Sequence, residues 1–208
     1  MKNKFIDEVE LACNLALASS GFYFPRRSTR LFPIAADTYG WVGLNRYKVG
    51  DTWWINPFIG LHCVPIMRLW YELDTYRKPK YLLGQTATAA LHLGELAPDI
   101  NGFHFEQGHP PEDEARRLAD AVVAFGMPWM RENANLEALL GLFREKEEML
   151  GGYPERIAVV LFLLGRFNEM SDYLDVQLHK YAQNPAWGEV TESWKQFSTA
   201  LRNRLPQR

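Results

Sequence analysis

Cysteine is scarce in this sequence. Only Cys13 and Cys63 occur among 208 residues, and neither belongs to a CxxC pair. A disulfide framework of the kind that stabilises small secreted domains needs more cysteines than this. Cys13 falls on the apolar face of an expected helix and Cys63 in an apolar run, so we expect two buried thiols in a reducing compartment.

Long hydrophobic runs are also missing. The longest apolar stretch, residues 157–164, is far too short to cross a bilayer. Near the N-terminus, Asp7, Glu8 and Glu10 interrupt the segment where a secretory signal needs an unbroken apolar stretch. These absences predict a cytoplasmic protein.

No excess of one charge sign is present. The chain has 23 basic and 25 acidic residues, a formal net charge of −2, which gives no reason to expect a nucleic-acid partner or a membrane surface. Arg26, Arg27 and Arg30 lie near the aromatic residues 22–24, an arrangement that single-strand binders use. Because the chain has no positive excess, we interpret this segment as a β-turn with solvated arginines.

Catalytic motifs are absent too. Nothing resembles GxxxxGK[ST], GxGxxG after a strand, GxSxG or HExxH. The strongest catalytic-looking cluster is His104, Glu106 and His109, because residues 104 and 106 of a strand point to the same face. Without a second group of ligands we interpret it as a polar edge strand that runs into a turn. We therefore expect no metal, no cofactor and no enzymatic activity, and we expect His62 to be a hydrogen-bonded core histidine.

What the sequence does contain is apolar residues, at 47%, and aromatic residues, at 13%, which suffice for a sizeable core. Apolar residues at helical spacing predict a helix over 4–19. Aromatic and branched runs separated by turn formers then predict strands over 30–34, 40–47 and 52–61. Strands joined by such short turns pair antiparallel, as a meander.

The middle of the chain is less regular. We expect a short helix over 65–73 and a short edge strand over 102–106. Residues 81–93 fit either a strand or a weak helix, and we favour a strand over 86–91. Trp53 and Trp54 are adjacent, so in a strand they point to opposite faces, one into the core and the other either covered by a helix or exposed.

After Pro111 the periodicity becomes helical. We expect a helix that begins with three acidic residues and ends at Phe125-Gly126, then a connection over 128–130. Further helices are expected over 135–150, 154–164, 167–183 and 186–205. The predicted fold is therefore α+β: one domain over 1–208, with a helix and an antiparallel meander sheet in 1–110 and a helical layer in 111–208.

The order of these features resembles a family of small bacterial proteins of unknown biochemical activity, often encoded beside polymorphic or contact-delivered toxins. The matching pieces are the helix that ends in Gly21-Phe22, the basic-aromatic segment to Phe32, strand 52–61, Gly84-Gln85-Thr86, the junction from 126–132 to 136–140, and the Gly165-Arg166-Phe167 joint. The chain departs from the family in its long 186–208 helix and its tryptophan content.

The resemblance implies an immunity protein, which binds a cognate toxin and occludes its active site. If that toxin is a nuclease with a basic cleft, acidic groups would face it. We therefore predict that Glu106, Glu112, Asp113 and Glu114, around a turn beside the edge strand, contact the toxin. Two alternatives remain open: a small enzyme that uses His104, Glu106 and His109, and a regulatory module that forms a homodimer through its sheet edge.

Overall fold

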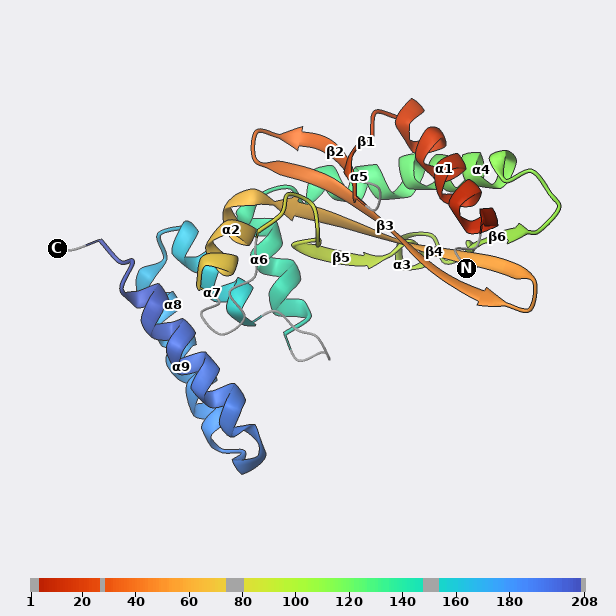
Figure 1. Cartoon of the computed structure of the whole chain (residues 1–208). Helices are drawn as coiled ribbons and strands as arrows, with labels where there is room; N and C mark the ends of the chain where they lie inside the picture. The colour runs from red at the N-terminus through yellow and green to blue at the C-terminus, as the bar shows by residue number, and fades with distance from the viewer. Residues whose placement is uncertain (1–3, 27–28, 74–80, 148–153, 207–208) are drawn as a thin grey trace. The chain divides into compact units, whose positions relative to one another are not determined.

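A computed structural model describes residues 4–26, 29–73, 81–147 and 154–206 (Figure 1). The chain divides into two compact units. One, here called the sheet unit, comprises Met1–Cys63 and Leu83–Ala134; the other, the helical unit, comprises Val64–Leu82 and Asn135–Arg208. The chain thus leaves the sheet unit after Cys63, returns to it at Leu83 and leaves it again after Ala134.

The sheet unit is built on a six-stranded antiparallel sheet, which confirms the α+β class with a meander. Its strands are β1 (Tyr23–Arg26), β2 (Thr29–Ala35), β3 (Thr38–Val49), β4 (Thr52–Cys63), β5 (Ala89–His92) and β6 (Phe103–Glu106). β3 and β4 form a hairpin that pairs from Thr38 opposite Cys63 to Val49 opposite Thr52. The turn uses Gly50 at a φ of 59°, a left-handed conformation that glycine adopts without steric strain.

Two short strands share the other side of β4. β5 pairs with residues 58–61 and β6 with residues 52–55, so β6 is an edge strand as expected. The strand favoured over 86–91 begins only at Ala89. Ahead of it, His62 holds the chain: its ring nitrogens lie 2.8 Å from the Thr86 oxygen and 3.2 Å from the Gly84 nitrogen. These side-chain bonds replace a strand ladder, and they show that His62 is a hydrogen-bonded core histidine.

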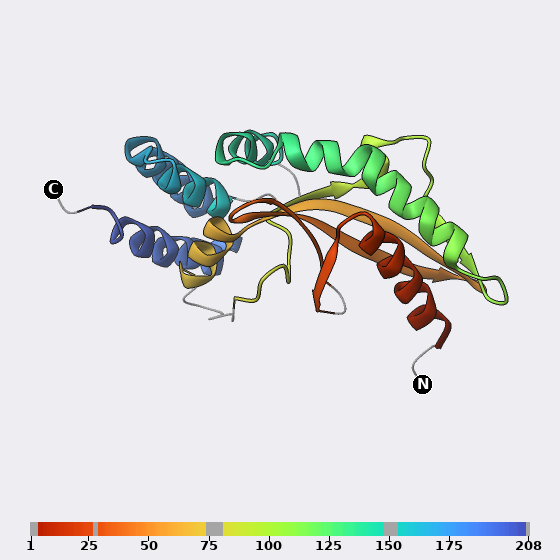
Figure 2. The same cartoon turned by 90° about the horizontal axis from the view of Figure 1, so that it is seen from above.

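One face of the sheet is covered by helices. α1 (Lys4–Ser19) and α4 (Glu112–Ala121) lie side by side over it (Figures 1 and 2). The strand residues on this face, such as Val42 and Ile59, are fully buried, as are Val9 and Leu118 of the two helices. The alternation of apolar residues in the strands thus meets the apolar stripe of each helix, which forms the core of this unit.

The helix that begins at Glu112 does not end at Gly126, and the expected connection over 128–130 is wrong. A π-helical turn, η1 (Val122–Gly126), leads directly into α5 (Met127–Glu132). Met127 donates its N–H to the Val122 oxygen, five residues earlier, so the helix widens by one residue just before Pro128, which has no N–H to donate. Gly126 is where the helix passes close to β4: a Cβ there would lie 3.0 Å from Ile59 Cδ1.

The basic-aromatic segment also differs from expectation. Residues 23–26 form strand β1, and Arg30 is not solvated: it is 2% exposed, and its Nε donates to Asn14 Oδ1 of α1 at 2.7 Å. Burial lowers the pKa of Arg30 to about 10. Arg27 lies outside the described residues. Arg30 is therefore part of the packing between helix and sheet, and it is not available to a polyanion.

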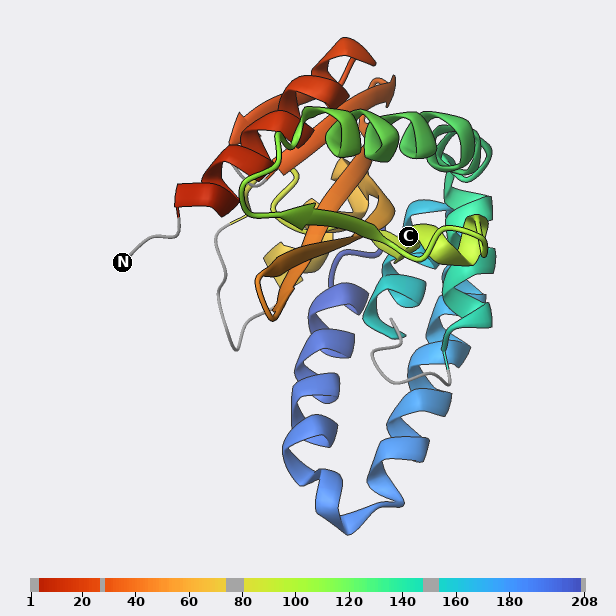
Figure 3. The ribbon, with the colours of Figure 1, turned by 90° about the vertical axis from the view of Figure 1, so that its right-hand side faces the viewer.

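The expected helical C-terminal half is confirmed by α4, η1 and α5 of the sheet unit together with the helices of the helical unit after Asn135. The helical unit contains α2 (Val64–Leu73), α6 (Leu136–Glu145), α7 (Pro154–Leu163), α8 (Phe167–Ala182), the 3₁₀ turn η2 (Pro185–Trp187) and α9 (Gly188–Arg202). α6 ends at Glu145, so the helix expected over 135–150 is shorter than predicted; residues 148–150 lie outside the described residues. α8 and α9 form an antiparallel hairpin (Figure 3). Within the described segments, none of the helices is both long enough and apolar enough to cross a bilayer.

Candidate functional site

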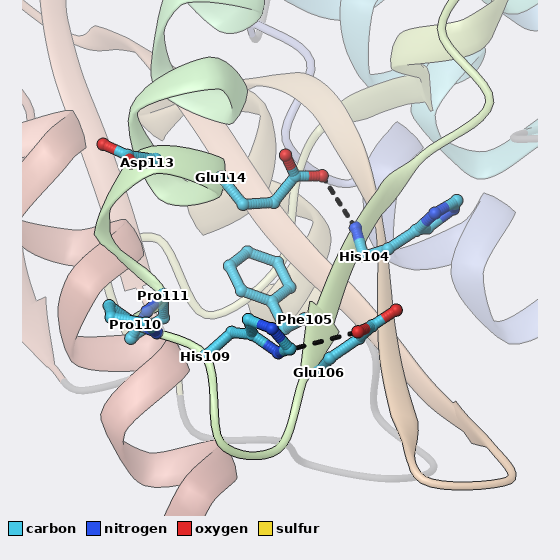
Figure 4. Close-up of a pocket in the computed structure, with 8 residues that line it drawn as sticks. All are labelled: His104, Phe105, Glu106, His109, Pro110, Pro111, Asp113 and Glu114. Carbon is cyan, nitrogen blue, oxygen red and sulfur yellow. Dashed lines mark hydrogen bonds and ion pairs between the residues drawn. The ribbon is translucent and has the colours of Figure 1, made fainter.

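The turn between β6 and α4 surrounds a shallow hollow of about 260 Å³ (Figure 4). Its lining comprises His104, Phe105, Glu106, His109, Pro110, Pro111, Asp113 and Glu114. In β6, Phe103 and Phe105 point into the core while His104 and Glu106 are exposed. This alternation places His104 and Glu106 on one face of the strand, as the sequence predicted. We call the surface formed by Glu106, Glu112, Asp113 and Glu114 the acidic corner.

Within the acidic corner, Glu114 has a structural role. Its Oε1 accepts the backbone N–H of His104 at 2.8 Å, and both of its oxygens accept hydrogen bonds from Arg117, at 2.6 and 2.8 Å. Burial by itself raises the pKa of Glu114. The hydrogen bonds from Arg117 and His104 together with the charge of Arg117 outweigh this effect and hold the pKa below its usual value. Glu114 therefore connects α4 to β6 as a carboxylate.

The other three acids project into solvent. The side chain of Glu106 is 64% exposed, and its Oε2 lies 3.6 Å from His109 Nδ1. That of Asp113 is 94% exposed, and its Oδ1 lies 3.3 Å from a nitrogen of Arg116. Glu112 is exposed as well. Such exposed ion pairs contribute little to stability, so these three carboxylates remain available to a partner.

The three residues of the enzyme alternative do not converge. His104 packs its ring on Trp54, with ring centroids 3.7 Å apart, and points away from His109 (Figure 4). Only Glu106 and His109 approach each other. Over the described part of the chain, no three His, Cys, Asp or Glu side chains lie close enough to hold a metal ion.

Sequence reasoning missed two features of this region. One is Arg117, whose position three residues after Glu114 on a helix was the available signal. The other is a row of rings across three strands, in which Trp54 stacks on Tyr47 at 6.0 Å and contacts His104 on its other side. This row depends on the cross-strand register of Tyr47, Trp54 and His104. Trp53 points to the opposite face, and both tryptophans are half-buried.

Comparison of the chain with protein-family models, with curated proteins and with solved structures found no match.

Proposed function

We propose that this protein is a cytoplasmic immunity protein, which neutralises a cognate toxin by binding it and occluding its active site through the acidic corner. The observation that carries the proposal is the exposure of Glu106, Glu112 and Asp113 beside the shallow hollow between β6 and α4. A binding surface needs accessible charge on a fixed frame, and it needs no convergent catalytic groups.

The frame of the acidic corner supports this role. Glu114 and Arg117 connect the start of α4 to β6. Across the turn, the backbone carbonyl of Glu106 accepts the backbone N–H of His109 at 3.2 Å. The exposed carboxylates are therefore displayed on backbone that is held at several points. A preorganised surface loses less conformational entropy when it binds. The partner that fits is a protein with a basic patch at or beside its active site.

The geometry of the acidic corner supports the two alternatives, a small enzyme and a homodimer, less well. An enzyme using His104, Glu106 and His109 would need the His104 ring turned toward the other two residues, and it packs on Trp54 instead. A homodimer through the edge of β6 would need free backbone groups there, and three of them are occupied. A toxin-binding role requires neither change.

The test is a complex between this protein and the toxin encoded next to its gene. Co-expression should rescue growth, and the purified proteins should form a tight 1:1 complex. Changing Glu106, Glu112 and Asp113 together to lysine should slow association at low salt by about tenfold or more, because steering by surface charge acts on the association rate.

A matched control reverses three exposed acids that are not part of the acidic corner, Asp120, Asp172 and Glu192. It changes the net charge equally and should reduce the association rate much less. If the wild-type protein neither binds nor protects against the neighbouring toxin, the immunity proposal fails. If it protects and both triple variants behave alike, only the placement of the interface fails.

A further inference from the structure

Three backbone groups along the outer edge of β6, including the Gly102 carbonyl just before the strand, bond to the protein's own groups. In an antiparallel strand, alternate residues direct their backbone N–H and C=O toward the same neighbour. His104 donates its N–H to Glu114 Oε1, so the residues in phase with it direct their backbone groups away from β4. The carbonyl of Gly102 accepts from Arg117 at 3.2 Å, and the carbonyl of Glu106 accepts from the N–H of His109.

Two side chains on one helix supply most of this cover. Glu114 accepts the N–H of His104 and Arg117 donates to the carbonyl of Gly102. A further strand paired with β6 would bond to the same two backbone groups. Arg117 also lies over the Phe103 ring, with its guanidinium carbon 4.8 Å from the ring centroid. The hydrogen bonds between Glu114 and Arg117 hold the two groups at the spacing that the edge presents.

We propose that Glu114 and Arg117 form a clasp that closes the outer edge of β6 against addition of a strand from a second copy of this chain. An open strand edge is a template for pairing, and other copies of the chain carry the same edge in the same compartment. The clasp keeps the protein monomeric, and it leaves the other three acids of the acidic corner, Glu106, Glu112 and Asp113, exposed. This inference concerns self-association, so it stands independently of the toxin proposal.

Helix α4 contains a second ion pair with which the clasp can be compared. Asp113 and Arg116 form an ion pair of the same charge and spacing, displaced by one residue. Their side chains are 94% and 69% exposed, whereas that of Glu114 is 23% exposed. The one-residue offset turns the first pair into solvent and the second toward β6.

The test compares two double variants by sedimentation velocity over a wide range of protein concentration. Replacing Glu114 and Arg117 with alanine should shift the mass from the 24.0 kDa of one copy toward twice that value as concentration rises. Replacing Asp113 and Arg116 with alanine should leave a monomer at every concentration, as for the wild type. Circular dichroism checks that each variant is folded.

A proline separates strand pairing from unspecific association. Adding His104→Pro to the Glu114→Ala, Arg117→Ala variant removes the outward N–H without removing a ladder bond to β4, and edge strands tolerate proline at such positions. This triple variant should return to a monomer. If the double variant does not fold, the single variants Glu114→Ala and Arg117→Met are measured instead. Each frees one backbone group of the edge, so each should form some dimer at the highest concentrations, where the wild type stays a monomer.

Three results would overturn the proposal. The folded clasp variants could stay monomeric, the Asp113→Ala, Arg116→Ala control could associate equally, or the wild type could form a dimer that His104→Pro dissociates.

Discussion

Replacing Gly126 with alanine should destabilise the sheet unit, although the same change stabilises most helices. The gain in helix propensity is about 1 kcal/mol. The new Cβ would lie 3.0 Å from Ile59 Cδ1 and 3.3 Å from its Cγ2, and Ile59 is fully buried. Overpacking of this kind costs about 1–3 kcal/mol. The two effects leave a net loss of about 1 kcal/mol in the free energy of unfolding.

Gly141 provides the matched control. It lies inside α6, and apart from its chain neighbours and its own helix backbone no atom is within 4 Å of a Cβ built on it. Gly141→Ala should therefore stabilise the helical unit by about 0.5–1 kcal/mol. Urea denaturation followed by circular dichroism measures both changes, with each variant compared with the wild type.

A second substitution tests the cause. Ile59→Val removes the Cδ1 methyl that the alanine would meet and by itself costs about 0.5–1.5 kcal/mol. In that background Gly126→Ala should cost less than it does in the wild type, with an interaction energy of about 0.5 kcal/mol or more. If Gly126→Ala proved as stabilising as Gly141→Ala, the close approach of the helix to β4 would be refuted.

Three further predictions rest on single contacts. The folded-state pKa of Glu114 is lowered from 4.5, so its contribution to stability is complete above pH 4.5 and is lost as pH falls through the folded-state pKa. Glu114→Gln should therefore flatten the decrease in unfolding free energy at acidic pH, measured by urea titrations at several pH values. An unchanged pH dependence would refute this role. Asn135 caps α6 by accepting the Ala138 N–H at 2.9 Å, so Asn135→Ala should cost about 1 kcal/mol, measured by the same denaturation. Burial raises the pKa of the Cys13 thiol to about 12, so a thiol reagent should label it only after denaturant is added, and rapid labelling of the native protein would contradict its burial.

The sequence by itself determined the elements whose periodicity agrees with their packing. The hairpin of β3 and β4 follows from aromatic and branched runs joined by a turn with Gly50, and α8 and α9 follow from apolar spacing on either side of Asn184-Pro185. Local patterns suffice here because each of these segments contacts its neighbour along the chain. The same reasoning placed His104 and Glu106 together on one face of an edge strand.

Only the tertiary structure decided the roles of residues whose partners are distant in sequence. Gly126 looked like the end of a helix because glycine is a common helix terminator, whereas its role is to let the helix approach Ile59. Arg30 looked solvated because arginine usually is, whereas Asn14 of α1 holds it beneath the helix.

The acidic corner shows the same division. Four carboxylates close together in sequence looked equivalent, but the direction of α4 turns Glu114 toward β6 and leaves Glu112 and Asp113 in solvent. Sequence spacing gives the face of a helix on which a residue lies. What covers that face depends on how the chain packs in three dimensions, because contacts between distant segments are decided by the whole core.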